Sequence, residues 1–331
     1  MKHRKGLLAV LAAALLLSGC GSQTLTLVNV SYDPTREFYA AYNEEFISWY
    51  QPQCSQPIEV LPSHGGSGSQ ARSVIEGVDA DVVTLALAHD VSLIEKAGLI
   101  DPGWIDELPD NSSPYTSTIV FLVRSGNPKH ITDWDDLTVP GVDVITPDPK
   151  SSGGACWNFL AAWSYALQCF DGDEAQAREF VRALYANVLV MDSGARGATT
   201  TFVENGQGDV LIAWENEAIA SMREYPGQFE LITPSISIKA EPSVAVVDEN
   251  VDYNGTRDAA QAYLEHLYSD EAQRLAGQYG YRPSNADILS EFADTFDLTV
   301  QLCCIDDFGG WDQAYEDFFA DDALFDQIYR G

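Results

Sequence analysis

Short apolar runs alternate with amphipathic stretches along most of this chain, and each kind of run predicts one kind of element. β-rich runs of four to seven residues predict strands at Leu25–Val30, Ile58–Leu61, Asp81–Leu87, Thr118–Val123, Val142–Ile145, Val188–Met191, Val210–Trp214 and Val244–Val247. Helical spacing predicts helices over Ser67–Gly77, Gly154–Gln168, Ala175–Tyr185, Ala198–Glu204 and Thr256–Leu267. This alternation indicates an α/β fold with mostly parallel sheets.

The first helix after the opening strand has a clear start signal. Its aromatic residues recur on one helical face, at Phe38, Tyr42, Phe46 and Trp49. Asp33 and Pro34 stand before them, and these residue types favour the N-cap and the first helical position. The sequence therefore predicts a helix capped by Asp33, with the carboxylate turned back toward the helix.

The N-terminus has the pattern of an export signal. Basic residues precede an apolar run over Leu7–Leu17, which is too short for a stable transmembrane helix. The run ends in Leu-Ser-Gly-Cys, which resembles a lipobox with Cys20 as the lipidated residue. We predict a lipoprotein signal peptide over 1–19 and a lipid-anchored tether over 20–24, so that the protein works outside the cytoplasmic membrane. An ordinary signal peptide with an incidental cysteine is the alternative.

The charge balance excludes one class of partner. The 331 residues contain 18 Lys and Arg against 50 Asp and Glu, a formal net charge of −32, and nucleic acid would be repelled. Residues 1–19 carry three basic groups and no acidic one, so their removal changes the charge to −35. Hydrophobic residues make up 46% and the mean hydropathy is −0.12, which is typical of a folded chain. The length favours two domains.

The remaining cysteines leave their pairing open. Five follow Cys20, at positions 54, 156, 169, 303 and 304. An exported protein permits disulfides, but an odd number leaves at least one cysteine unpaired within the chain. Because no Cys-x-x-Cys or Cys/His ligand spacing occurs, the sequence predicts neither a metal site nor a cofactor.

Four loops that open predicted helices carry the candidate chemistry, and three of them are rich in Gly and Ser. They are Ser31–Pro34, Ser63–Ser69, Ser151–Gly154 and Asp192–Gly197. A helix N-terminus exposes unpaired N–H groups and a partial positive charge, so it holds an oxyanion without a lysine. A single loop of this kind is usually structural. Four of them at the carboxyl ends of strands, where open α/β sheets bind ligands, indicate an anion site.

These loops and their neighbouring strands closely resemble the sulfate-binding proteins of bacterial sulfate/thiosulfate ABC transporters. The resemblance runs from about residue 25 to the end, over segments that include 28–36, 63–69, 81–87, 114–124, 147–154, 192–198, 208–217, 308–311 and 325–328. It implies a two-lobed periplasmic-binding-protein fold of type II, with an anion bound in the cleft between the lobes. It also implies a monomer that delivers sulfate to ABC permease subunits. Thiosulfate, molybdate and tungstate are alternative ligands, and a sensor lipoprotein outside transport is an alternative role.

Two Pro/Gly/Ser-rich breaks mark candidate crossings between the lobes, near Asn111–Pro114 and Thr233–Pro242. We predict lobe 1 over 25–118, lobe 2 over 119–238, and a return to lobe 1 with the C-terminal helices over 239–331. The acidic and aromatic run Asp306–Asp326 predicts the solvated face of an amphipathic helix.

The resemblance also implies the ligand contacts. The donors are the backbone N–H of Asp33, the N–H and hydroxyl of Ser67, the N–H groups of Gly153, Gly154 and Ala195, and the indole N–H of Trp214. All of them are neutral donors, which suits sulfate because this dianion only accepts hydrogen bonds. Hydrogen phosphate should be excluded, since its proton would stay unsatisfied when buried. His64, Ser152 and Arg196 are expected to order the loops without contacting the ligand themselves.

Some of these residues have other interpretations. Asp33 could cap its helix without contacting the ligand, and Trp214 ends an apolar strand that, without the resemblance, would usually place it in the core. A serine hydrolase with Ser67 as nucleophile is the rival from another class. Against it, His64 is only three residues away in the same turn, and the sequence there is not Gly-x-Ser-x-Gly.

One position departs from the family pattern. Relatives carry an arginine after Gly-Gly-Ala, where this chain has Cys156. If that arginine pairs across the cleft with an acid at the position of Asp90, this latch is missing here. We therefore expect closure to rely on the ligand and on other contacts, and we predict that Cys156→Arg tightens binding.

Overall fold

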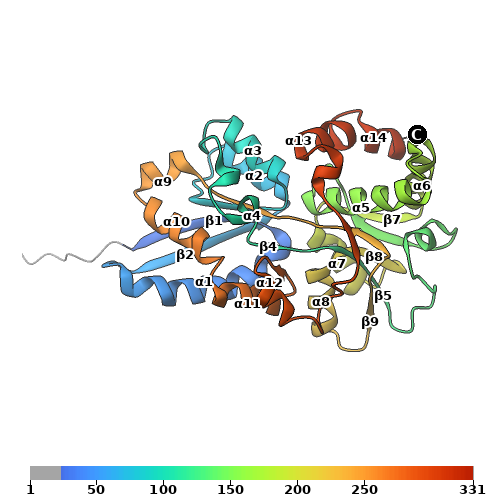
Figure 1. Ribbon diagram of the computed structural model, residues 1–331, viewed down its shortest axis with the longest axis horizontal. Helices are drawn as coiled ribbons and strands as arrows, with labels where there is room; N and C mark the ends of the chain where they lie inside the picture. The colour runs from blue at the N-terminus through green and yellow to red at the C-terminus, as the bar shows by residue number, and fades with distance from the viewer. Residues whose placement is uncertain (1–23, 331) are drawn as a thin grey trace, which may run out of the picture.

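Each of two lobes is built around its own β-sheet, as the computed structural model shows for residues 24–330 (Figure 1). The two-lobed α/β fold predicted from the sequence is confirmed. The predicted signal peptide and Cys20 lie outside the described residues and remain predictions. Between residues 24 and 330, no helix combines the length and the apolar character that crossing a membrane requires.

The sheet of lobe 1 has the strand order β11-β3-β1-β2. Its strands are β1 (Leu25–Tyr32), β2 (Ile58–Gly65), β3 (Val82–Leu85) and β11 (Ser243–Val246). β1 pairs in parallel with both β2 and β3, and β11 pairs antiparallel with β3. β2 continues through Ser63, His64 and Gly65, which the sequence had placed in a turn.

Helices cover both faces of this sheet because successive strand residues point to opposite sides. Val82 joins one core cluster and Val83 joins the other. The first cluster takes the aromatic face of α1 (Arg36–Tyr50) together with α10 (Arg257–His266) and α11 (Asp270–Gln278). The second takes α2 (Ser67–Ile75) and α3 (Ala88–Lys96).

The sheet of lobe 2 has the order β7-β6-β8-β5-β9. Its strands are β5 (Ile119–Arg124), β6 (Val144–Pro147), β7 (Val188–Asp192), β8 (Val210–Trp214) and β9 (Phe229–Ile232). β6 pairs in parallel with β7 and β8, whereas β5 is antiparallel to β8 and β9. Its main helices are α5 (Gly153–Cys169), α6 (Glu174–Ala186), α7 (Ala195–Val203) and α8 (Glu215–Glu224).

The chain passes between the lobes three times. At the first two passages, Ser117 and Ala240 exchange backbone hydrogen bonds of 2.9 Å, so these two segments run side by side. The third passage leads from β12 (Arg282–Pro283) to β13 (Gln301–Cys303), which pairs with β10 (Ile236–Ile238). The remaining short elements are β4 (Tyr115–Thr116), α4 (Pro109–Ser112), α9 (Asp248–Asn254) and α12 (Ala286–Ser290).

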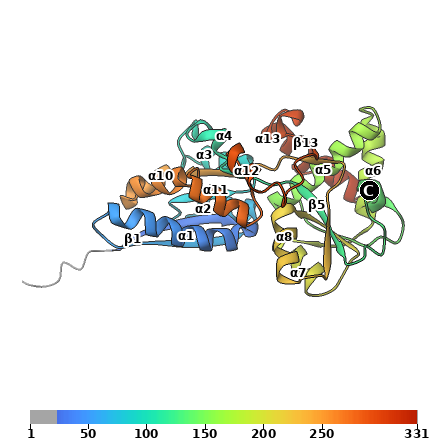
Figure 2. The ribbon, with the colours of Figure 1, turned by 60° about the horizontal axis from the view of Figure 1, so that its bottom comes forward.

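The third passage carries the C-terminal helices to lobe 2, where they lie beside α5 and α6 in both views (Figures 1 and 2). The sequence had grouped them with the second part of lobe 1. The acidic and aromatic run is also not one helix but α13 (Trp311–Ala314), a π-helical turn (Tyr315–Phe319) and α14 (Leu324–Arg330). Its rings supply core contacts, since Phe319 and Phe325 are buried, and its acidic residues are mostly exposed.

Candidate anion-binding site

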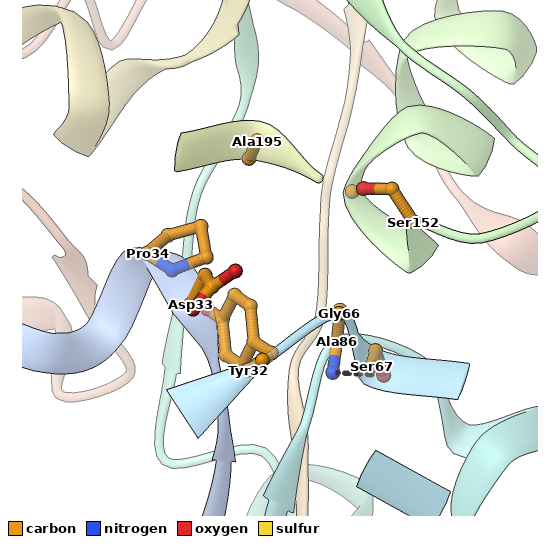
Figure 3. Close-up of a pocket in the computed structure, with 10 residues that line it drawn as sticks. Tyr32, Asp33, Pro34, Gly66, Ser67, Ala86, Ser152 and Ala195 are labelled. Carbon is orange, nitrogen blue, oxygen red and sulfur yellow. Dashed lines mark hydrogen bonds between the residues drawn. The ribbon is translucent and has the colours of Figure 1, made fainter. Parts of the chain in front are cut away.

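A small pocket lies between the lobes where four helical N-termini converge. Its lining residues are Tyr32, Asp33, Pro34, Gly65, Gly66, Ser67, Ala86, Ser152, Gly154 and Ala195. Figure 3 shows Ser152 and Ala195 of lobe 2 facing Asp33, Gly66 and Ser67 of lobe 1. The pocket contains about 220 Å³ of space free of protein atoms, part of it open to solvent, which is below the usual size of pockets for drug-sized ligands. Its size therefore suits a small ion.

The two sheets explain why these N-termini meet. In lobe 1, β1 leads into a 3-10 turn at Asp33–Thr35 before α1, and β2 leads into α2 with Gly66 as N-cap. In lobe 2, β6 leads to α5 with Ser152 as N-cap, and β7 leads to α7 with Gly194 as N-cap. First-turn N–H groups have no acceptor within their own helix, so each N-terminus offers free donors and a partial positive charge.

Four of the six residues predicted to contact the ligand line this pocket: Asp33, Ser67, Gly154 and Ala195. Ser152, predicted to order its loop, also lines it, and its hydroxyl accepts a 3.4 Å hydrogen bond from the N–H of Ala155. The sequence placed Tyr32, Pro34, Gly65 and Gly66 in the candidate loops without naming them as ligand contacts, and it did not name Ala86. The first four each adjoin a predicted site residue. Ala86 directly follows β3, and its position at the carboxyl end of a strand is the signal that could have identified it.

Gly153 lies in the first turn of α5, where that helix approaches lobe 1. A Cβ atom there would lie 2.9 Å from Leu87 Cγ and 3.0 Å from Ser67 Cβ. This glycine therefore lets α5 pack directly against the other lobe.

Trp214 is not among the lining residues. Its indole Nε1 donates to the carbonyl of Gly154 at 3.2 Å, and its ring faces a neighbouring cavity that includes Glu217. This differs from the expected donation into the pocket. The reason is that a buried indole N–H requires an acceptor, and the Gly154 carbonyl supplies one.

The Ser67 hydroxyl is engaged within lobe 1. It donates to Asp90 Oδ2 and accepts from the N–H of Ala86 at 3.0 Å. Only the backbone N–H of Ser67 is therefore left for a ligand in this arrangement, whereas the sequence had predicted both donors. Burial raises the pKa of the Asp90 carboxyl to about 6, although the hydrogen bond from Ser67 and the charge of Arg72 oppose this shift.

The prediction that Asp33 caps the first helix is wrong. The residue begins the 3-10 turn, the N-cap of that turn is Tyr32, and no capping hydrogen bond is formed. The turn is held instead by Thr35, whose hydroxyl donates to the Tyr32 carbonyl at 2.6 Å. The Asp33 carboxylate pairs with Arg36 at 3.3 Å, so it remains at the pocket as a partly balanced charge.

Arg196 reaches across the cleft. Its guanidinium pairs with Glu37 of α1 at 3.2 Å, so it links α7 of lobe 2 to lobe 1 and does not line the pocket. His64 also stays outside the lining, with Nδ1 buried and without a partner. Burial and the nearby Arg36 lower the pKa of His64.

The geometry of Ser67 also argues against the hydrolase alternative. A nucleophilic serine needs a base within hydrogen-bond reach. The partners of the Ser67 hydroxyl are Asp90 and a backbone N–H, and His64 is not one of them.

The lobes are in direct contact around the pocket. Trp157 of α5 donates its indole N–H to the carbonyl of Ala86 in lobe 1 at 3.0 Å. A Cβ atom on Gly66 would lie only 2.8 Å from the carbonyl oxygen of Ser151 in lobe 2. The structure is therefore in a closed arrangement.

Cys156 lies near this contact but forms no latch. It is buried, and its thiol donates to the carbonyl of Pro149 at 3.4 Å. All five cysteines within residues 24–330 are free.

Two lobes that close on an ion-sized pocket define an extracellular solute-binding protein. A family model described as bacterial extracellular solute-binding protein matches residues 30–282. The sulfate-binding protein of Escherichia coli (strain K12) is 54% identical over 98% of both chains. The thiosulfate-binding protein of Pseudomonas aeruginosa is 46% identical over 97% of both.

A solved structure gives the same result. The sulfate-binding protein SubI from Mycobacterium tuberculosis H37Rv superposes with a TM-score of 0.81 at 34% identity, covering 89% of this chain and 99% of its own. The chain belongs to the family of bacterial sulfate-binding proteins, which confirms the resemblance seen in the sequence. It is a solute-binding protein and not an enzyme.

Proposed function

We propose that this protein captures sulfate in the pocket between its lobes and delivers it to the permease of an ABC transporter. The observation that carries the proposal is the convergence of four helical N-termini, two from each lobe, on one ion-sized pocket. Among the lining residues only Asp33 carries a charge, and none is Lys or Arg. An anion in this pocket is held by neutral dipoles.

The proposed donors are the backbone N–H groups of Asp33, Ser67, Gly153, Gly154 and Ala195. The Trp214 indole joins them if it exchanges the Gly154 carbonyl, 3.2 Å away, for a sulfate oxygen. The indole needs to move only a short distance for this exchange, because it already lies beside Gly154: a Cβ atom on Gly154 would lie 3.2 Å from the indole nitrogen. His64, Ser152 and Arg196 act on the arrangement of the loops and lobes.

Sulfate is favoured over hydrogen phosphate by the chemistry of this donor set. Every proposed ligand group donates, so the phosphate proton has no acceptor among them, and a buried donor left without an acceptor costs about 1–3 kcal/mol. Thiosulfate remains the second candidate, since a relative named for it is 46% identical.

The proposed working place is the outer side of the cytoplasmic membrane. The predicted signal peptide over 1–19 and lipidated Cys20 support export and anchoring, and the extracellular solute-binding family supports the same compartment. The described body begins at residue 24, so in a chain attached at Cys20 this first residue would stay within about 15 Å of the lipid surface.

Calorimetric titration of residues 21–331 tests the proposal. Sulfate, thiosulfate, molybdate and phosphate are added separately at pH 8 and fixed ionic strength. We expect one sulfate per chain and much weaker binding of phosphate. Tight phosphate binding without a response to sulfate would overturn the proposal, and a clear preference for thiosulfate would replace the ligand.

A further inference from the structure

The C-terminal segment 311–326, which we call the strap, packs on lobe 2 through its aromatic side chains. Trp311 meets Trp157 edge to face, with ring centroids 4.6 Å apart. Phe318 and Phe319 pack on Phe159 with centroid distances of 5.8 and 5.5 Å. These contacts make the strap a fixed part of lobe 2.

The strap also contacts lobe 1, on the outer side of the cleft. The Tyr315 ring stacks on His89 of α3 with a centroid distance of 3.9 Å and an interplanar angle of 12°. Asp312 Oδ1 lies 3.3 Å from His89 Nδ1 and 3.4 Å from Lys96 Nζ. Helix α3 of lobe 1 is thus in contact with the strap, which is packed on lobe 2.

The strap is joined to the anion pocket as well. Lys150 directly precedes Ser151 and Ser152 and donates to the carbonyls of Phe319 at 2.9 Å and Ala320 at 3.1 Å. Its ammonium also pairs with Asp326 at 3.3 Å. Two of the four lysines beyond residue 19 therefore contact the strap.

We propose that the strap is a clamp between the lobes, and that Tyr315 and Asp312 slow the release of the bound anion by holding α3 in the closed arrangement. The proposal rests on the proposed function for the identity of the anion. Its physical basis is that the strap moves with lobe 2, so opening at the crossing segments must separate Tyr315 and Asp312 from α3. A contact that exists only in the closed arrangement stabilises that arrangement. It therefore lowers the rate of opening without touching the ligand.

The clamp explains how closure is secured without an arginine at position 156. Cys156 is buried and forms no ion pair, and the strap supplies a stacked ring and an ion pair outside the pocket. Tyr315 and Asp312 act as positioning residues, since neither lines the pocket.

Charge exchange between the lobes gives the sharpest test. Lys96→Glu and Asp312→Lys each place like charges opposite one another, and the double variant restores an opposite pair. Glu316→Lys is the matched control, because it makes the same charge change on the next turn of the strap, where Glu316 lines a surface hollow together with Arg178 and Glu174 of lobe 2. Tyr315→Leu removes the stacked ring.

The measurement is the sulfate dissociation rate, followed by tryptophan fluorescence in a stopped-flow chase. We expect each single variant at position 96, 312 or 315 to release sulfate about threefold to fivefold faster, since the Lys96–Asp312 pair is exposed. The charge-exchanged double variant and Glu316→Lys should stay within twofold of the wild type. Single variants that all release sulfate at the wild-type rate would overturn the clamp.

A second readout separates this proposal from the proposed function. If the wild type binds no sulfate, the proposed function fails, and the clamp is judged by small-angle X-ray scattering of the ligand-free protein. A larger radius of gyration in the single variants than in the wild type and in Glu316→Lys supports the clamp. Equal radii in all of these proteins contradict it.

Discussion

At the level of single residues, two glycines determine how closely the lobes approach. The positions that Cβ atoms would take on Gly66 and Gly153 lie within 3.0 Å of atoms in the opposite lobe. Gly66 has φ −61° and ψ 135°, which any residue adopts, so its role is to leave space and not to permit an unusual backbone conformation.

A methyl group at Gly66 should therefore act as a wedge. Gly66→Ala places Cβ 2.8 Å from the Ser151 carbonyl oxygen, and relief of this overlap requires the lobes to stay slightly apart. An overlap of this kind costs about 1–3 kcal/mol, so we expect the sulfate dissociation constant to rise about tenfold, with little change in thermal stability.

Gly68→Ala is the control for the wedge. Its Cβ would lie 3.5 Å from Asp90 Oδ1, an ordinary contact within lobe 1. Calorimetry of both variants checks the prediction. Equal dissociation constants for Gly66→Ala and the wild type would show that the lobes do not close as described.

Asp90 gives a prediction on pH. Burial raises its pKa to about 6 in the folded chain, against an ordinary value of 3.8 for an aspartate. The folded state thus binds the proton more tightly, and the stability that this provides is complete below pH 4 and is lost as the pH rises through 6. At pH 8 the buried charge costs about 2–3 kcal/mol.

Asp90→Asn should remove this cost and retain an acceptor for the Ser67 hydroxyl. We expect the variant to be more stable than the wild type by about 2–3 kcal/mol at pH 8 and to match it at pH 4. Urea unfolding at both pH values measures this, with the exposed Asp317→Asn as control. A difference that does not change between pH 4 and pH 8 contradicts the prediction.

The individual site residues also show how much of the site the sequence could predict. The local pattern predicted the four loops that contain Asp33, Ser67, Gly154 and Ala195, because each loop stands between a strand and a helix, and the family resemblance named the residues. The hydroxyl of Ser67 and the indole of Trp214 took partners that depend on tertiary contacts, and no local pattern contains those contacts.

At the level of secondary structure, strands and helices with strong local signals were predicted well. β8 has the predicted bounds, and α5 differs from its predicted range by one residue at each end. Local patterns failed where the decisive partner is far along the chain. β10 pairs with β13, more than 60 residues away, and the C-terminal aromatic side chains find their partners on α5.

A buried ion pair ties the start of α8 to β12 at the crossing segments. Arg282 contacts both oxygens of Glu215 at 2.6 and 2.9 Å, and both side chains are almost fully buried. Removal of one partner leaves an unpaired buried charge, which costs about 3–5 kcal/mol. We therefore expect Arg282→Met to lose that much free energy of unfolding.

Arg274→Met is the matched variant. It breaks an exposed pair with Glu291 at 3.0 Å, and such pairs contribute about 0–1 kcal/mol. Chemical denaturation compares the two variants. A similar loss of unfolding free energy in both variants would show that the buried pair at the crossing segments contributes no more than the exposed one.

At the level of the whole molecule, the net charge of −32 opposes the approach of a dianion. Binding must then come from the short-range donors of the pocket. The acidic residues lie outside the pocket almost without exception, since the pocket lining contains one charged side chain.

This separation predicts an unusual dependence on salt. Added NaCl screens the repulsion between protein and sulfate, so the association rate constant should rise roughly threefold between 10 and 200 mM. Stopped-flow fluorescence measures it directly. A rate constant that falls with salt would reveal an attractive field that the charge balance does not provide.

We propose that neutral N–H groups from both lobes hold the sulfate, and a crystal structure of residues 21–331 with sulfate shows whether they do. We expect sulfate oxygens about 2.7–3.2 Å from the backbone nitrogens of Asp33, Ser67, Gly154 and Ala195, with no Lys or Arg side chain in contact. Sulfate held by the guanidinium of Arg36 or Arg196, or bound outside this pocket, would contradict it.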